Sequence, residues 1–173
     1  MKDREKIMGD ELKGKELKGR KIVSVIGTST ASPELYQMAR ETGRLLAERG
    51  CIVVCGGRGG VMEGVCLGVA EGGGVSVGLL PTSLSEANPY VSIPLVTGLG
   101  EVRNVAVVSA GQAVISIGGA YGTLSELGFA MRQGKPVVGL GTWQIRDEKG
   151  EPAAMVRVST PLEAVTAALE GLS

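Results

Sequence analysis

Three glycine-rich segments contain the residues with the clearest potential for ligand chemistry in this sequence. They are Gly27-Thr28-Ser29, Gly56-Gly57-Arg58-Gly59-Gly60 and Gly118-Gly119-Ala120-Tyr121-Gly122-Thr123. Glycine lets a backbone approach a ligand closely, and free N–H groups at the start of a following helix favour an anion. Together, the three segments predict a binding site for a phosphorylated ligand. None of them matches the GxGxxG dinucleotide fingerprint or the Walker A motif.

Arg103 and Glu126 are the candidates for phosphate binding and acid–base chemistry. Arg103 is isolated within an apolar stretch, and an arginine there suits a phosphate group. Glu126 follows the third glycine segment and could move a proton beside a bound ligand. Each has a structural alternative. Thr123 and Glu126 have the spacing of a helix capping box, and Arg103 could form a salt bridge with Glu101 or another carboxylate.

Two more side chains in the glycine segments, and the cysteines, have alternative interpretations. Arg58 either holds an anion within its segment or extends into solvent. Tyr121 either stacks on a base or pterin, or simply packs within its turn. Without histidine, the three cysteines are poor metal ligands. We therefore expect Cys51, Cys55 and Cys66 to be buried thiols.

The composition excludes several classes of function. The 173 residues include no histidine, which removes Ser-His-Asp and Cys-His catalysis and any histidine-ligated metal site. The 18 basic and 18 acidic residues cancel, and aromatic residues are few, so we expect no nucleic-acid partner. No apolar run is long enough for a membrane span. The odd number of cysteines favours reduced thiols and a cytoplasmic location.

Apolar runs alternate with amphipathic stretches along the chain. This alternation predicts a single α/β domain of the Rossmann-like class, a doubly wound, mainly parallel sheet with helices on both faces. Strands are expected at 21–27, 51–55, 75–80, 92–96, 112–117, 136–140 and 155–158, and helices are expected to begin at Ser32, Met62, Glu101, Thr123 and Thr160. Pro94 restricts its strand to an edge. The glycine segments follow the strands at 21–27, 51–55 and 112–117, so they meet at the carboxyl edge of the sheet, where such folds bind ligands.

The chain divides into two parts of different composition. Residues 1–20 hold seven basic and five acidic side chains and are expected to form a charged tail. Residues 21–173 form the expected nucleotide-binding domain. Within it, the stretch 102–108 is apolar on more than one side, which predicts deep burial or a subunit contact. We therefore expect a homodimer or homotetramer with contacts from this helix.

Three blocks of the sequence resemble the SLOG-type Rossmann superfamily. They are Ile26-Gly-Thr-Ser29, Cys55-Gly-Gly-Arg-Gly-Gly-Val-Met62 and Ile117-Gly-Gly-Ala-Tyr-Gly-Thr-Leu-Ser-Glu126. The second block is similar to the family motif GGGxxGLM, and the third to PGGxGTxxE. This superfamily includes the LOG-type nucleoside 5′-monophosphate phosphoribohydrolases and the proteins similar to molybdenum-cofactor carriers.

Departures from the motifs bear on function. Ala120 and Tyr121 stand where the phosphoribohydrolases have one residue, Asn104 follows Arg103 in place of a lysine, and Ile117 replaces a proline. The longer glycine segment resembles the carrier-like branch. The resemblance thus implies a carrier for a phosphorylated nucleotide-like or pterin-type cofactor. One alternative is a phosphoribohydrolase that cleaves nucleoside 5′-monophosphates to base and ribose 5-phosphate. A third interpretation is a sensor or scaffold domain that binds a nucleotide signal.

The resemblance also assigns expected roles and ligands. Arg103 aligns with the ligand-contacting arginine of the family, and Glu126 with its catalytic glutamate. The bound ligand would be the molybdenum cofactor or a nucleotide. Some members of the superfamily carry a lysine decarboxylase label. Nothing in this sequence indicates a lysine that holds pyridoxal phosphate, so we do not expect that activity.

Overall fold

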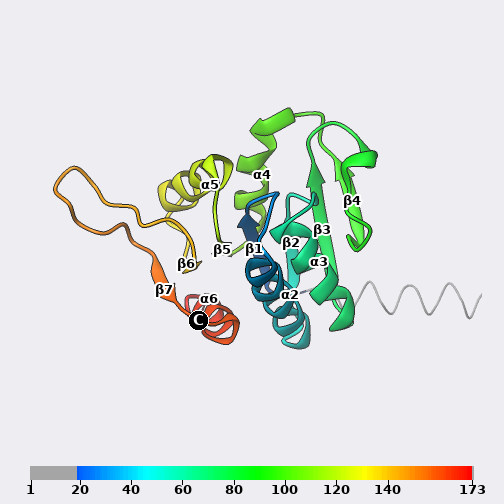
Figure 1. The fold of residues 1–173 in the computed structure, drawn as a ribbon, viewed down its shortest axis with the longest axis horizontal. Helices are drawn as coiled ribbons and strands as arrows, with labels where there is room; N and C mark the ends of the chain where they lie inside the picture. The colour runs from blue at the N-terminus through cyan, green and yellow to red at the C-terminus, as the bar shows by residue number, and fades with distance from the viewer. Residues whose placement is uncertain (1–18, 173) are drawn as a thin grey trace, which may run out of the picture.

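Seven parallel strands form the middle layer of the protein, in a computed structural model that describes residues 19–172. They are β1 (Ile22–Gly27), β2 (Ile52–Cys55), β3 (Val75–Leu80), β4 (Ile93–Val96), β5 (Ala113–Ile117), β6 (Val137–Leu140) and β7 (Val156–Val158). Their spatial order is β4-β3-β2-β1-β5-β6-β7, and every neighbouring pair is parallel. The predicted strands are all present, and the strand with Pro94 lies at an edge, as expected (Figure 1).

Helices cover both faces of this sheet, which confirms the doubly wound α/β prediction. They are α2 (Pro33–Glu48), α3 (Val61–Glu71), α4 (Arg103–Ala110), α5 (Tyr121–Arg132) and α6 (Pro161–Glu170), with short 3-10 helices η1 (Leu84–Glu86) and η2 (Gly100–Val102). In Figure 1, α4 and α5 lie above the strands, whereas α2, α3 and α6 lie below them. The chain switches face between β1 and β5, because the helix after β1 is α2 and the helix after β5 is α5.

Two hydrophobic cores hold the layers together. Alternate side chains of a strand point to opposite faces of its sheet. Val23 and Val25 of β1 accordingly join the core under α2, α3 and α6, whereas Ile26 joins the core under α4 and α5. β5 is buried along its whole length. The apolar runs of these central strands therefore correspond to strands covered on both faces.

Two helix starts were predicted correctly from their capping residues. Ser32 caps α2, where its hydroxyl accepts a hydrogen bond from the backbone N–H of Leu35 at 3.3 Å. Thr160 caps α6 in a full capping box with Glu163. In both helices a proline occupies the first turn, where its missing N–H has no cost.

Two other helix starts were predicted wrongly. α5 begins at Tyr121, with Ala120 at the cap position, so Thr123 lies inside the helix and forms no capping box with Glu126. The predicted helix 101–110 is split into η2 and α4, and α4 begins at Arg103. In α4, Val107 and Val108 are fully buried in this chain. Deep burial, not a subunit contact, therefore accounts for these two residues.

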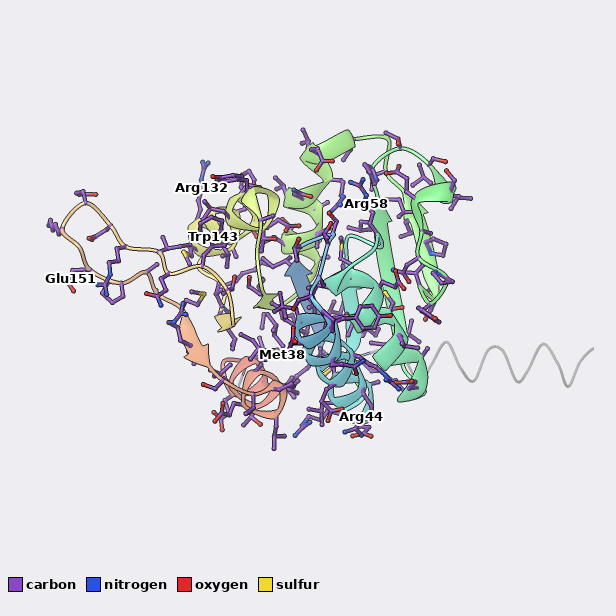
Figure 2. The ribbon with its side chains drawn as sticks, viewed as in Figure 1. Met38, Arg44, Arg58, Arg132, Trp143 and Glu151 are labelled. Carbon is purple, nitrogen blue, oxygen red and sulfur yellow. The ribbon has the colours of Figure 1, made fainter. Side chains whose placement is uncertain are left out.

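The segment between β6 and β7 is a hairpin-like excursion. Arg146 and Pro152 form an antiparallel bridge, and the Asp147 carboxylate accepts hydrogen bonds from the N–H groups of Lys149 and Glu151. Glu151 is labelled near its tip in Figure 2. Most of the predicted tail, residues 1–18, lies outside the described residues. Within 19–172, no helix has the length and apolar character that a bilayer crossing requires.

Candidate functional site

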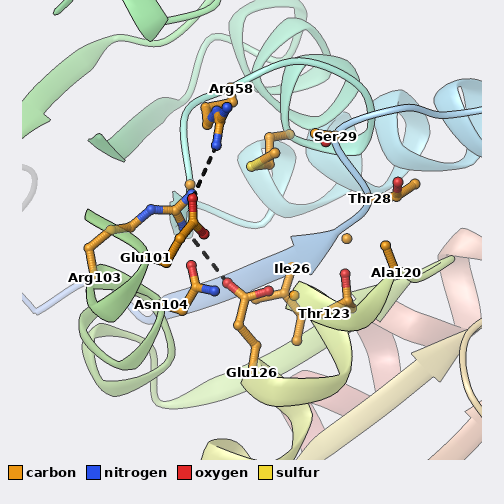
Figure 3. A pocket seen from close by; sticks show the side chains of 14 residues that line it. Ile26, Thr28, Ser29, Arg58, Glu101, Arg103, Asn104, Ala120, Thr123 and Glu126 are labelled. Carbon is orange, nitrogen blue, oxygen red and sulfur yellow. Dashed lines mark ion pairs between the residues drawn. The ribbon is translucent and has the colours of Figure 1, made fainter. Parts of the chain in front are cut away.

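The carboxyl ends of β1, β2 and β5 surround a cavity of about 130 Å³. Figure 3 shows the side chains that line it. The lining residues are Ile26, Gly27, Thr28, Ser29, Gly56, Arg58, Met62, Glu101, Arg103, Asn104, Ala120, Gly122, Thr123 and Glu126. All three predicted glycine segments contribute to this set. The cavity thus lies at the predicted edge of the sheet, beside the point where the chain switches face.

Backbone contacts bring the glycine segments together. The N–H of Val61 donates to the carbonyl of Thr28 at 3.0 Å. Gly60 has a φ of 65°, and a Cβ there would lie 2.5 Å from the carbonyl carbon of Ser29. A Cβ on Gly27 would lie 2.5 Å from the carbonyl oxygen of Ile117. Part of the glycine pattern is therefore needed for the loops to pack against one another, before any ligand is considered.

Arg103 is the buried cation of the cavity. Arg103 is the first residue of α4, and it is 4% exposed. The guanidinium lies against the backbone of Gly56, where a Cβ would be 2.7 Å from Nη1. Its Nε has no hydrogen-bond partner among the described residues. A buried guanidinium with an unused donor is costly unless an acceptor binds to it, so this arrangement suits an anionic ligand.

Glu126 faces Arg103 from α5. Its Oε1 lies 3.8 Å from Arg103 Nη1, and the residue is 6% exposed (Figure 3). Burial raises the pKa of Glu126 from 4.5 to about 7, although the charge of Arg103 opposes the shift, and the charge of Glu101 adds to it. A carboxyl group with a pKa near neutrality can both donate and accept a proton. Because Thr123 is no cap, the capping interpretation of Glu126 is wrong.

Arg58 closes the mouth of the cavity with a charged network. Its guanidinium lies 3.5 Å from Glu101 and 3.7 Å from Glu86. The two roles predicted for Arg58 were to hold an anion or to extend into solvent. Neither of them included these ion pairs with Glu86 and Glu101. Exposed ion pairs of this kind contribute little to stability, so Arg58 can exchange Glu101 for another anion.

Two of the helices that start at the cavity, α3 and α5, differ from α2 and α6 at their first turns. Gly60 and Ala120 occupy their cap positions, and neither provides a side-chain cap. The N–H of Val61 in α3 is already bonded to the carbonyl of Thr28. The other first N–H groups of a helix without a side-chain cap remain available to a ligand, and the helix dipole favours a negative charge there. The two helix starts thus reinforce the preference for an anion.

The remaining predicted residues lie outside the lining of the cavity. Gly57, Gly60 and Gly118 have positive φ values of 71°, 65° and 59°, so they shape the turns. The last two predicted glycines differ in their surroundings. Gly59 lies near Ser29, and Gly119 packs against the Trp143 indole.

Two asparagines at the site were missed as functional candidates. Asn104 is 8% exposed and lines the cavity beside Arg103, although the sequence analysis treated it only as a departure from a motif. Asn88 holds the second glycine segment from outside, because its Nδ2 donates to the carbonyls of Gly57 at 3.1 Å and Arg58 at 3.0 Å. Its only signal in the sequence is an asparagine before Pro89, a pattern typical of turns.

The cysteines are buried and free, as predicted. Cys55 Sγ and Cys66 Sγ lie 3.6 Å apart beneath the second glycine segment, and the N–H of Gly57 points to the Cys55 sulfur at 3.3 Å. Cys51 belongs to the core under α2, α3 and α6. The thiols support the loop from below and do not line the cavity.

Larger surface hollows occur at the other end of the sheet. One of about 550 Å³ lies between β7 and α6, and its lining includes Leu162 and Glu163. The Glu163 carboxylate is already bonded to the backbone N–H groups of Ser159 and Thr160. The smaller cavity differs because it gathers buried charged groups, which is the usual mark of a ligand site.

Comparison with known proteins gives a consistent family match. Residues 20–165 match the model of the SLOG cluster4 family. The molybdenum cofactor binding protein of Rippkaea orientalis superposes with a TM-score of 0.81 at 28% identity, covering 90% of this chain and 99% of that one. The molybdenum cofactor carrier protein of Chlamydomonas reinhardtii gives a TM-score of 0.78 at 30% identity, covering 88% of this chain and 98% of that one.

One similar sequence belongs to an enzyme. The cytokinin riboside 5′-monophosphate phosphoribohydrolase LOG of Oryza sativa subsp. japonica is 34% identical over 114 residues. This match covers 62% of this chain and 47% of the rice protein, or about half of its length. The expected resemblance to the SLOG superfamily is thereby confirmed. Both kinds of protein named in the sequence analysis are represented among the similar proteins.

Proposed function

This chain belongs to the SLOG cluster4 family, and from that premise we propose that it binds a small phosphorylated ligand in the cavity between β1, β2 and β5. The observation that carries this proposal is the buried Arg103, whose Nε has no partner among the described residues. Two helix starts without side-chain caps face the same space. A phosphate would complete the hydrogen bonds of all three features.

Within this class of ligand, we favour a carrier of a phosphorylated pterin-type cofactor. The molybdenum cofactor proteins of Rippkaea and Chlamydomonas cover most of this chain, whereas the match to the rice enzyme covers less of both chains. Two sequence features support the same choice. The third glycine segment is one residue longer than in the phosphoribohydrolases, and Asn104 replaces the lysine expected there.

Different residues of the cavity would bind different parts of the ligand. Arg103 and the first N–H groups of α3 and α5 would hold the phosphate. Arg58 would turn from Glu101 to the ligand at the mouth of the cavity. Asn104, beside Arg103, would offer an amide to the sugar or to the linker between phosphate and ring. No step in this scheme requires a bond to be broken, which is consistent with a carrier.

Glu126 favours a second candidate, a phosphoribohydrolase. A buried carboxyl group with a pKa of about 7 is suited to protonate a departing base at neutral pH. In that reaction a water molecule would add to the sugar carbon as its bond to the base breaks. Glu126 would give its proton to the departing base, the proton that the water loses would return to the Glu126 carboxylate, and ribose 5-phosphate would remain on Arg103.

The binding proposal is tested with protein purified from its own host. Native mass spectrometry should find a bound phosphorylated ligand on the wild-type protein. Arg103→Ala should weaken binding of that ligand by roughly 10- to 150-fold, the value of a hydrogen bond to a charged group. The control is Arg132→Ala, which removes an exposed arginine of α5 and should retain the ligand. Equal retention by both variants would contradict the assigned role of Arg103.

The choice between carrier and enzyme is tested by product release. Wild-type protein incubated with nucleoside 5′-monophosphates should release no ribose 5-phosphate if it is a carrier. If it is an enzyme, turnover should be measurable and should fall by a factor of about 10² to 10⁴ in Glu126→Gln. Turnover by the wild-type protein that is lost in this variant would replace the carrier proposal with the hydrolase.

A further inference from the structure

Trp143, the single tryptophan of the chain, lies against the third glycine segment. Its indole Nε1 donates to the carbonyl of Ala120 at 3.2 Å. A Cβ on Gly119 would lie 2.6 Å from both Cδ1 and Nε1 of the indole, so only glycine permits this approach. Trp143 also packs against the core beneath α5 (Figure 2). The indole is thus fixed in position beside the cavity by the backbone of the segment itself.

Tyr121 extends this aromatic surface into solvent. It lies between Ala120 and Gly122, which both line the cavity. Its side chain is 83% exposed, and its ring centroid lies 5.9 Å from that of Trp143 at an interplanar angle of 37°. Packing within its turn, the structural alternative for this tyrosine, is therefore wrong. A large exposed aromatic side chain at the rim of a ligand cavity is better explained by a ligand.

The size of the cavity indicates where the rest of the ligand must lie. Its volume is about 130 Å³, whereas pockets for whole small molecules usually measure about 300–1,000 Å³. The enclosed space therefore accommodates a phosphate and a sugar-sized group, but not an additional ring system. The ring has to extend over the rim. On the side of Arg58 and Glu101 the rim is charged, and on the side of Ala120 it is aromatic.

We propose that Tyr121 and Trp143 form a stacking platform for the planar heterocycle of the bound ligand, a purine or a pterin. This inference rests on the proposed function, because it takes the phosphate to be held at Arg103. Every nucleobase or pterin has a π-face, so stacking on such a platform tolerates different rings. Because of the platform, the protein would bind ligands that carry a heterocycle more tightly than ligands that lack one.

The test uses three probes, AMP, GMP and ribose 5-phosphate, on the full chain. Guanine shares its aminopyrimidinone ring with pterins, and ribose 5-phosphate lacks a heterocycle. AMP and GMP should quench the fluorescence of Trp143, whereas ribose 5-phosphate should not. Both nucleotides should also bind about ten-fold or more tightly than ribose 5-phosphate, because each base stacked on an aromatic group adds this much or more.

Variants separate the platform from the phosphate site. Tyr121→Ala should weaken AMP and GMP binding by about ten-fold and leave ribose 5-phosphate binding unchanged. Tyr90→Ala, which removes a partly exposed tyrosine outside the cavity lining, should change neither. Arg103→Ala should weaken all three probes.

Two outcomes would overturn the inference in distinguishable ways. If nucleotides bind no better than ribose 5-phosphate, and Tyr121→Ala has no effect, the platform is refuted while the phosphate site stands. If none of the three probes binds to wild-type protein, the proposed function and the platform fall together.

Discussion

Glu126 and Arg103 form a buried pair whose charge state changes near neutral pH. Neither side chain has much contact with water, and among residues 19–172 the guanidinium is the opposite charge that favours ionisation of the carboxyl group. Burial outweighs that attraction, so the pKa of Glu126 rises to about 7. The protein therefore retains a carboxyl group that is about half protonated near neutral pH. This property serves a ligand-binding hydrogen bond as well as acid catalysis.

We expect the contribution of Glu126 to the stability of the protein to fall as the pH rises from about 4.5 to about 7. Below this range Glu126 is protonated in the folded and unfolded chain alike. As the pH rises, the unfolded chain loses the proton first, so the folded state is disfavoured until its own pKa is passed. A shift from 4.5 to about 7 corresponds to about 3 kcal/mol. Glu126→Gln should remove this contribution from the pH dependence of the free energy of unfolding, measured with urea.

Glu163 supplies a control of opposite sign. Its bonds to the N–H groups of Ser159 and Thr160 lower the pKa of its carboxyl group. The stability that it contributes is present above its unfolded pKa and is lost as the pH falls through its folded pKa. Glu163→Gln should therefore alter stability at neutral pH and converge with wild type in acid. If Glu126→Gln and wild-type protein had parallel pH profiles, the raised pKa of Glu126 would be refuted.

At the scale of elements, α2 and α3 pack unusually closely through glycines. A Cβ on Gly43 would overlap the carbonyl oxygen of Val65, and one on Gly68 would overlap that of Arg40. Gly64 likewise faces the carbonyl of Tyr36, at 2.8 Å from its would-be Cβ. These three glycines bring the two helices into backbone contact under the sheet. They account for part of the high glycine content, 28 of 173 residues, outside the three segments from which a ligand site was predicted.

We expect Gly68→Ala and Gly128→Ala to have opposite effects on stability. The first adds a methyl group where backbone already lies, and overpacking of this kind typically costs about 1–3 kcal/mol. The second adds it in α5, where nothing lies within 4 Å of the new atom. Replacing a helical glycine there should stabilise the protein by about 0.5–1 kcal/mol. Urea unfolding of both variants tests the prediction, and equal changes in the free energy of unfolding would contradict it.

Local sequence patterns predicted strands and capped helix starts correctly, but they did not predict uncapped helix starts or contacts between distant residues. Ser32 and Thr160, each followed by proline, set their helix starts correctly because the cap and the first turn are local interactions. The prediction that Thr123 caps a helix failed because α5 starts at Tyr121 without a side-chain cap. A helix start without a capping side chain has no sequence pattern that marks it. Asn88 was missed because it reaches Gly57 from about thirty residues away, and only the folded loop brings them together.

For the site as well, features that depend on local sequence were predicted, whereas features that depend on tertiary contacts were not. The three glycine segments were found because each follows a strand, and parallel strands place such segments at one edge. Arg58 pairs with Glu86 and Glu101, and Arg103 pairs with Glu126. These pairs depend on how η1, η2, α4 and α5 approach the cavity. Gly119 looked like a ligand-binding glycine, but it serves the approach of Trp143. Residue types were thus readable from the sequence, and so was a carboxylate partner for Arg103, but that this partner is Glu126 and not Glu101 depends on the fold.

At the scale of the whole molecule, the sheet has one edge that is poorly protected from association. Natural edge strands usually carry charges or are covered. β4 reads Ile93-Pro94-Leu95-Val96, with no charge, and Ile93, Leu95 and Val96 are each more than 40% exposed. Leu99 and Val102, which follow it, are 53% and 70% exposed. This edge surface, which consists of the exposed side chains of Ile93, Leu95, Val96, Leu99 and Val102, is apolar enough to favour a partner.

We therefore expect the protein to form a homodimer or homotetramer in which this edge surface, rather than the buried side of α4, makes contact. Pro94 lacks an N–H, so side chains rather than a continued sheet should dominate the contact. Val102→Glu would place a charge in it and should shift the mass measured by sedimentation toward a single chain at micromolar concentration. Leu162→Glu is the matched control, because Leu162 is 53% exposed on α6, beside the opposite edge strand β7. A wild-type mass of one chain would refute association. If Leu162→Glu dissociates the oligomer and Val102→Glu does not, the subunits associate through the edge formed by β7 instead.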